Sequence, residues 1–281
     1  MPTPDQLPDA GSAGGRSALA TATRPMLAVS GLSAGYNGIA VVRELDLTVA
    51  AGEVVALLGS NGAGKTTTLS AIAGLIKPLA GSITFEGDEI GGESAHRVAR
   101  RGIALVPEDR ALFHDLTTRE NLRVARSRDS ASDDEVLDLL PELRRCLGRK
   151  AGLLSGGEQQ MLAVGRALVG KPRMLIVDEM SLGLAPVVVE RLLPVLRAAA
   201  TTFGSGVLVV EQHVSLALDV AERAYVLAHG RLVVQGRTAD LRSRRDLLMA
   251  CYLGDLDAAA ALSAGIDNDS AGEAGGLTSS A

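Results

Sequence analysis

The stretch GSNGAGKTT, residues 59–67, is the strongest indication of the fold, because it fits the pattern G-x-x-x-x-G-K-[ST]. It follows the apolar run VVALL (54–58), and a helical pattern begins at its lysine. Glycines let a backbone turn tightly and aim several N–H groups inward, and a helix directs the positive end of its dipole out of its N-terminus. The stretch therefore predicts a strand, a phosphate-binding loop and a helix, in that order.

Two side chains of this loop have chemical roles in the pattern. Lys65 can reach the β- and γ-phosphates of a nucleotide, and the hydroxyl of Thr66 can ligate Mg²⁺. The whole loop is expected to surround the nucleotide: Gly59, Ser60, Asn61, Gly62, Ala63, Gly64, Lys65, Thr66 and Thr67.

A second motif, MLIVDE (174–179), is an apolar strand that ends in two acids. Beside a phosphate-binding loop, Asp178 suits a direct or second-sphere contact to Mg²⁺, and Glu179 can polarise an attacking water. Phosphoryl transfer needs both, because its catalysis is mainly positioning and charge neutralisation. Taken alone, the motif is also compatible with a solvated strand end.

A third motif, LSGGEQQ (154–160), precedes the helical pattern MLAVGRALVG. Ser155 and Glu158 form a capping box, S-x-x-E, so the motif is in part a well-capped helix start. Gly156 and Gly157 lower the helix propensity of the first turn, and a cap alone would not call for them. They make sense if a ligand approaches the backbone here, which implies a second anion site on a second surface.

Short apolar runs alternate with helical patterns along the chain. The expected strands cover residues 27–30, 45–49, 54–58, 83–85, 103–106, 174–177, 207–210 and 224–227. The expected helices cover residues 65–76, 156–169, 187–200 and 214–222. Several strands are apolar at every position, which suits a sheet covered on both faces. The pattern predicts an α/β fold with a mainly parallel sheet and a mostly helical insert over about 91–154.

The bulk composition is that of a globular protein of 281 residues with a net charge of −5, which does not favour non-specific nucleic-acid binding. Residues 1–25 and 255–281 are rich in small and polar residues, and we expect both to be disordered. No apolar run reaches the roughly 18 residues that span a bilayer, and the start does not have the pattern of a secretion signal. Cys146 and Cys251 have no ligand spacing, which points to core positions in a reducing compartment.

With these three motifs in one order, residues 26–254 resemble the nucleotide-binding subunits of ABC transporters. The resemblance implies a P-loop NTPase core with a mainly parallel sheet, an antiparallel β-subdomain and a helical subdomain at about 91–155. It implies ATP and Mg²⁺ as ligands, held between two subunits packed head to tail, so that Ser155, Gly156, Gly157 and Glu158 serve the partner's ATP. By the same resemblance Tyr36 would stack on adenine, the alternative being an aromatic residue in a surface turn.

Four stretches narrow the resemblance to the ATPases of branched-chain amino acid importers: IALVPEDRALFHDLTTRENL (103–122), DEMSLGLAP (178–186), VVEQHVSLAL (209–218) and CYLG (251–254). The chain is most like the subunit with the shorter helical domain. The partners implied are a second ATPase subunit, in a heterodimer or a homodimer, two integral-membrane permease subunits and an external binding protein. The expected location is peripheral, on the cytoplasmic face of the cell membrane. Urea or short-amide uptake and lipopolysaccharide-type export are the alternatives.

The sequence departs from the general ABC pattern at three positions. Glu108 stands where most relatives have a glutamine that contacts Mg²⁺ and water, and an acid there is compatible with Mg²⁺. Met180 replaces the proline that usually follows the catalytic acid, so the turn lacks a rigid φ and we expect altered loop stiffness. The segment SLGL (181–184) lacks the aspartate that many relatives place at its end.

A fourth difference concerns the switch histidine that senses the γ-phosphate in the family. It comes second after the last apolar residue of its strand, and here that position is Gln212, with His213 one place late. Gln212 can hydrogen-bond the γ-phosphate but cannot take a proton near neutral pH. We therefore expect Gln212 and Glu179 to be the catalytic pair, and His213 to lie at the start of the next helix.

Two other ABC classes remain as hypotheses. A DNA-repair or chromosome-organising ATPase would carry a long coiled coil, and no sustained heptad run is present. A translation-associated ABC protein normally has two ATPase modules, whereas this chain has one phosphate-loop motif and one LSGG motif.

Overall fold

The computed structural model describes residues 25–126, 130–244, 246 and 248. Within them, a six-stranded sheet carries the phosphate-binding loop, with strand order β10-β9-β3-β8-β7-β6. Its strands are β3 (Val54–Gly59), β6 (Ile103–Val106), β7 (Met174–Asp178), β8 (Gly206–Glu211), β9 (Arg223–Ala228) and β10 (Arg231–Arg237). All neighbours pair in parallel except β9 and β10, which form an antiparallel hairpin. The predicted mainly parallel sheet is confirmed.

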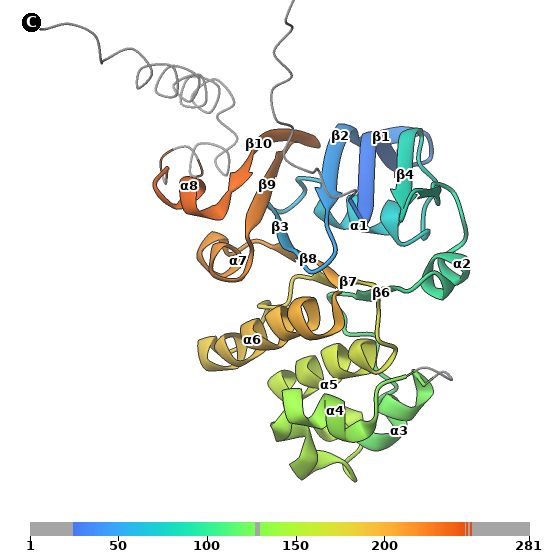
Figure 1. Cartoon of the computed structure of the whole chain (residues 1–281), viewed down its shortest axis with the longest axis vertical. Helices are drawn as coiled ribbons and strands as arrows, with labels where there is room; N and C mark the ends of the chain where they lie inside the picture. Colours follow the sequence, from blue (N-terminus) through green and yellow to red (C-terminus); the bar gives the residue numbers. More distant parts are fainter. Residues whose placement is uncertain (1–24, 127–129, 245, 247, 249–281) are drawn as a thin grey trace, which may run out of the picture.

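A second sheet is antiparallel and has the order β2-β1-β4-β5 within the described residues. Its strands are β1 (Leu27–Tyr36), β2 (Ile39–Val49), β4 (Ala80–Phe85) and β5 (Asp88–Glu89). It is the expected antiparallel β-subdomain, and it lies beside helix α1 (Lys65–Ile72) in Figure 1.

The central strand β3 shows why these strands are apolar at every position. Val55 and Leu57 contribute to a core shared with the antiparallel sheet and α1, whereas Val54, Ala56 and Leu58 contribute to a core shared with the long helices. Side chains of a strand alternate between the two faces of its sheet. Because both faces of β3 are covered, every position is buried, and polar residues begin only where the strand ends.

One group of helices is centred on α5 (Gly156–Val169). This helix packs against α3 (Thr118–Val124), α4 (Asp133–Leu139) and α6 (Pro186–Phe203), and Figure 1 shows α3, α4 and α5 at the end of the molecule away from the antiparallel sheet. The remaining helical elements are α2 (Ala95–Arg100), η1 (Pro141–Cys146), η2 (Ala151–Leu153), α7 (Val214–Val220) and α8 (Thr238–Arg242). None of the described helices is long and apolar enough to cross a membrane.

The structure refines several expected boundaries. The helix predicted over 65–76 ends at Ile72, because Gly74 takes a left-handed conformation with φ of 71°. The strand predicted over 103–106 is present as β6, inside the range expected to be mostly helical, and it pairs with β7 at the edge of the main sheet. The strand β10 was not predicted from the sequence, although His229 and Gly230, both with positive φ, make a hairpin turn after β9. The expected disordered ends, Cys251 and the CYLG stretch lie outside the described residues, apart from residue 25.

Candidate functional site

The phosphate-binding loop leaves β3 at Gly59 and enters α1 at its N-cap, Gly64. Gly64 has a φ of 104°, and a Cβ there would lie 2.7 Å from Cγ2 of Val42. Gly59 has a φ of 158°, and a Cβ there would lie 2.5 Å from the carbonyl oxygen of Leu227. Glycine is therefore required at both ends of the loop, because neither position has room for a side chain.

Lys65 is held at the centre of this loop. Its side chain is only 4% exposed, and its ammonium donates hydrogen bonds to the carbonyl oxygens of Gly59 at 2.9 Å and Ser60 at 3.2 Å. The same nitrogen lies 3.2 Å from Oε1 of Glu179. A fixed ammonium beside a glycine-rich loop at the N-terminus of a helix is suited to a bound polyphosphate.

Asp178 brings a buried carboxylate to the same edge of the sheet, at the end of β7. Its side chain accepts a hydrogen bond at Oδ2 from the Thr66 hydroxyl at 3.3 Å, and Oδ1 is buried with no partner among the described residues. Burial, with the charges of Glu179 and Glu108, raises the pKa of Asp178 to about 6. A buried carboxylate with a raised pKa and an oxygen without a partner is suited to bind a cation. A bound cation would contact Oδ1 and lower the pKa of Asp178.

These residues fit a Mg²⁺ ion that is bound together with a nucleotide. Among the described residues, no group of three His, Cys, Asp or Glu side chains is arranged to hold a metal ion alone. Mg²⁺ commonly takes only one or two protein ligands, with substrate phosphates and water completing its shell. Thr66, Asp178 and the exposed Glu108 line one hollow, so they offer a partial set of ligands of that kind.

Glu179 follows β7 in a left-handed conformation, with a φ of 43°. Its N–H donates to the carbonyl oxygen of Val210 at 2.9 Å, which continues the β7–β8 pairing by one residue. Its side chain lines a hollow with Lys65, Thr66 and Glu108. The turn therefore aims the carboxylate at the phosphate loop.

Gln212 and His213 occupy different environments at the end of β8. Glu211, the last residue of β8, pairs with Leu58 of β3, so Gln212 comes next to the start of the phosphate loop. Gln212 is half-buried, whereas His213 is exposed. His213 is the N-cap of α7, as its predicted position implied, but its side chain makes no capping hydrogen bond. That Gln212, and not His213, contacts a γ-phosphate stays a prediction.

The LSGGEQQ segment lies apart from these groups, at the N-terminus of α5. The predicted capping box is present: Ser155 Oγ accepts from the Glu158 N–H at 3.3 Å, and Glu158 Oε2 accepts from the Ser155 N–H at 2.8 Å. The Ser155 N–H also holds the pKa of Glu158 below its ordinary value. Ser155 and Gly156 are exposed, and no residue of the segment is among those that line the phosphate hollow.

The two glycines of this segment have different reasons. A Cβ on Gly157 would lie 3.0 Å from both Cγ atoms of Val188 in α6, so packing already favours glycine there. A Cβ on Gly156 would meet its nearest atoms, in Arg110 and Leu184, only at 3.8 Å. Packing against α6 thus explains Gly157. The predicted close approach of a ligand remains as the explanation for Gly156 alone.

Tyr36 ends β1 and is half exposed, next to the turn at Asn37 and Gly38. The next strand, β2, carries Val41, which lines the phosphate hollow, so the hairpin reaches that hollow. An exposed ring at this position has a free face for stacking. The stacking of Tyr36 on adenine stays a prediction.

Two residues that connect these segments were not predicted from the sequence. Arg110 follows Glu108, and its guanidinium donates to Gln160 Oε1 at 2.9 Å and to Gln159 Oε1 at 3.0 Å. It therefore joins the Glu108 loop to the LSGGEQQ helix. Glu211 is buried and bonded to Ser181. Its signal in the sequence was an acid directly before Gln212, at the end of an apolar run.

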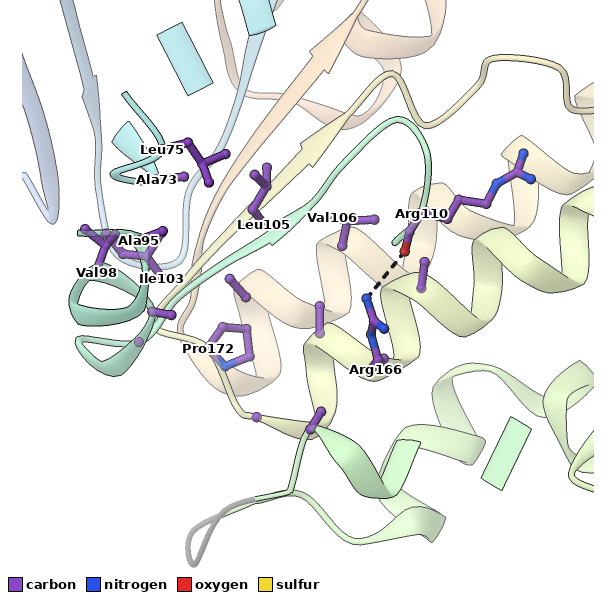
Figure 2. Close-up of a pocket in the computed structure, with 17 residues that line it drawn as sticks. Ala73, Leu75, Ala95, Val98, Ile103, Leu105, Val106, Arg110, Arg166 and Pro172 are labelled. Atoms are coloured by element: carbon purple, nitrogen blue, oxygen red, sulfur yellow. Dashed lines mark hydrogen bonds between the residues drawn. The ribbon is translucent and has the colours of Figure 1, made fainter. Parts of the chain in front are cut away.

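A second hollow lies between β6, α2 and α5, away from the phosphate loop (Figure 2). Small and apolar side chains line most of it, including Leu75, Val98 and Leu105. Arg166 donates to the backbone oxygen of Arg110 at 3.4 Å at its rim. The hollow has no nucleophile or acid in its lining, so it is unsuited to phosphate chemistry.

Comparison with known proteins agrees with this geometry. The family model described as "ABC transporter" matches residues 42–181. The "High-affinity branched-chain amino acid transport ATP-binding protein BraG" of Pseudomonas aeruginosa is 40% identical over 234 residues, which cover 82% of this chain and 100% of that protein. The "Lipopolysaccharide export system ATP-binding protein LptB" of Escherichia coli is 35% identical, covering 82% of this chain and 97% of that protein.

A solved structure described as the "ATP binding subunit of ABC transporter" superimposes with a TM-score of 0.69 at 31% identity, covering 85% of this chain and 99% of that one. The predicted P-loop NTPase core is thereby confirmed. With a phosphate loop after β3, two acids at the end of β7 and a separate capped glycine segment in one fold, the chain belongs to the ABC transporter family and is one of its ATP-binding, ATP-hydrolysing subunits.

Proposed function

We propose that this chain energises uptake of branched-chain amino acids, as an ATPase subunit of an importer on the cytoplasmic face of the cell membrane. The similarity to BraG over that protein's whole length carries the proposal. A second relative named for branched-chain amino acid transport, LivF of Archaeoglobus fulgidus, is 35% identical over 98% of its length.

The nucleotide would lie across the phosphate loop, with N–H groups of residues 59–67 and the Lys65 ammonium on its phosphates. Tyr36 would stack on the adenine ring. Thr66 and Asp178 would hold Mg²⁺, with Glu108 beside them. When bound, Mg²⁺ would neutralise charge on the phosphates during transfer.

Hydrolysis would depend on the turn after β7. Glu179 would hold the attacking water by accepting a hydrogen bond from it and would polarise it toward the γ-phosphate. In the present arrangement its carboxylate lies 3.2 Å from the Lys65 nitrogen, so a phosphate that engages Lys65 would free the carboxylate for water. Gln212 would donate a hydrogen bond to the γ-phosphate and would not carry a proton.

Each ATP would be closed off by a second subunit packed head to tail. The exposed Ser155 and Gly156 would contact the partner's ATP, with Gly157 and Glu158 holding that helix start in place. The partner is a second ATPase subunit, the same or different, and the assembly includes two permease subunits and an external binding protein, without nucleic acid.

Purification of the membrane complex with this chain tests the transport proposal. We expect two permease proteins, and a binding protein whose bound ligand is leucine, isoleucine or valine by mass spectrometry. Transport of radiolabelled leucine into vesicles should require ATP inside. Recovery of a urea- or amide-binding protein would replace the substrate and leave the ATPase assignment intact.

Lipid export is the second candidate, because LptB is also similar over nearly its whole length. It predicts a complex without an external amino acid-binding protein, and ATP hydrolysis stimulated by a lipopolysaccharide and not by leucine. That outcome would overturn the import proposal.

A further inference from the structure

Glu211 is a buried carboxylate that the proposed mechanism does not use. It is 1% exposed at the end of β8, directly before Gln212. Its two oxygens both bind Ser181: Oε2 accepts from the hydroxyl at 2.7 Å, and Oε1 accepts from the backbone N–H at 3.0 Å. We call this two-bond contact the Glu211–Ser181 clasp.

The clasp requires a carboxylate to be buried, which is unfavourable for the free energy of folding. Burial raises the pKa of Glu211 above its ordinary value, against the lowering effect of the two Ser181 bonds, and the charge of nearby Glu179 adds to the rise. Burying a carboxylate rarely stabilises a fold relative to an apolar side chain of similar size. A contribution to stability alone is therefore a poor reason for an acid at this position.

What the clasp holds is the turn that begins with Glu179. That residue is left-handed without being glycine, a conformation that surrounding contacts must impose. Met180 follows where a proline would restrict φ, so the chain itself does not stiffen the turn. Two bonds from Glu211 to Ser181 supply the missing restraint from the neighbouring strand.

The same turn reaches the LSGGEQQ segment. The Leu184 N–H donates to the carbonyl oxygen of Ser181 at 3.1 Å, and the Leu184 side chain lies beside Gly156. Ser181 thus lies in a turn that connects Glu179 to Leu184, and Leu184 lies beside the exposed start of α5. A shift at Ser181 would move both.

We propose that Glu211 is a positioning residue that, through its clasp on Ser181, aims the Glu179 carboxylate at the attacking water. The proposal rests on the proposed role of Glu179. It predicts that the clasp contributes to turnover and not to ATP binding, because Lys65, Thr66 and Asp178 are held by other contacts.

Steady-state ATP hydrolysis by the purified transporter containing the full-length chain tests this. Glu211→Ala should lower kcat about tenfold or more while KM for ATP stays within about twofold, since misplacement by about 1 Å costs up to about 10²-fold in rate. Ser181→Ala, which keeps the backbone bond, should lower kcat less. Glu211→Gln should retain most activity, because its amide accepts from the Ser181 N–H and donates to the hydroxyl.

Ser205→Ala is the matched control. The Ser205 hydroxyl is also buried and donates to the Pro172 carbonyl oxygen at 2.5 Å, at the opposite ends of the same two strands. It should lower thermal stability as much as Ser181→Ala and leave kcat unchanged. An equal loss of kcat in both variants, or a kcat within twofold of wild type for Glu211→Ala, would overturn the clasp proposal.

Single-turnover rates in a Glu179→Gln background separate this proposal from the one on which it rests. Adding Glu211→Ala should then have no further effect, because the group that it positions is gone; a further tenfold loss would contradict the proposal. Full activity of Glu179→Gln alone would remove the role of Glu179 itself. If Glu211→Ala does not fold, Ser181→Ala with and without Glu179→Gln answers the same question.

Discussion

The two regions that we propose to contact ATP, the phosphate-loop edge and the start of α5, are built in opposite ways. The phosphate-loop edge brings Lys65, at the start of α1, together with Asp178 and Glu179 from the end of β7. Lys65 and Asp178 are buried, and the Lys65 nitrogen lies 3.2 Å from a Glu179 oxygen. The start of α5 is one local segment, exposed and closed by its own capping box. The difference fits the proposed head-to-tail arrangement, in which the phosphate loop would hold one ATP and the start of α5 would face the ATP of a partner subunit.

The largest expected effect is on the first region. Glu179→Gln should lower kcat by at least about a hundredfold, the usual contribution of a positioned base, while ATP binding persists. Hydrolysis in the assembled transporter and binding of a fluorescent ATP analogue are the measurements. Unchanged hydrolysis would remove Glu179 from the mechanism.

Ser155→Arg should separate the two regions directly. The bulky cation at the start of α5 should reduce hydrolysis by roughly tenfold or more, in the range seen when a phosphate-stabilising donor is lost. Photo-crosslinking of an ATP analogue should fall at the partner's phosphate loop and persist at this chain's own Lys65. Loss at its own site with an intact partner site would contradict the head-to-tail arrangement.

A smaller effect should distinguish the neighbours at the end of β8. Gln212→Ala removes one hydrogen bond to a charged phosphate, and we expect about a tenfold loss of kcat. His213→Ala should stay within about twofold, because that side chain is exposed and makes no capping bond. The reverse ranking in the same assay would show that His213 is the phosphate sensor.

Asp178→Asn should show that the buried charges of the first region are costly without ligand. The folded-state pKa of Asp178, about 6, lies above its ordinary 3.8, so the nucleotide-free fold loses stability as pH rises from about 4 to about 6, and the loss stays constant at higher pH. The variant should be more stable by roughly 1–2 kcal/mol at pH 7.5, by about half of that at pH 5, and not at all below pH 4. Denaturant unfolding without Mg²⁺ measures this; equal stability at pH 7.5 would contradict it.

The smallest effects should come from the glycines of the second region. Alanine is favoured over glycine in a helix by about 1 kcal/mol, so Gly156→Ala should stabilise the chain and impair only hydrolysis. Gly157→Ala gains the same propensity but presses on Val188, and it should be less stable than Gly156→Ala by about 1 kcal/mol. Thermal unfolding of the two variants decides it; equal stabilities would mean that α6 yields to the added methyl.

Sequence patterns predicted the local parts of both regions well. The phosphate loop, the apolar strand before Asp178 and the capping box of Ser155 each depend on residues a few positions apart, so their periodicity and spacing are visible in the chain. The end of α1 and the strand β10 were missed because each depends on the backbone conformation of one turn. These turns contain Gly74 after α1, and His229 and Gly230 after β9. Glu211 and Arg110 could not be assigned, since their partners lie 30 and about 50 residues away.

The phosphate loop, the two acids at a strand end and the capped glycine segment could all be predicted from the amino-acid sequence, because each is set by local spacing and backbone conformation. The contacts between distant segments show three further features: Glu211 clasps Ser181, Val188 favours glycine at position 157, and Asp178 has a buried oxygen with no partner among the described residues. Those facts depend on which strands and helices meet, and packing between distant segments has no local signature in the chain.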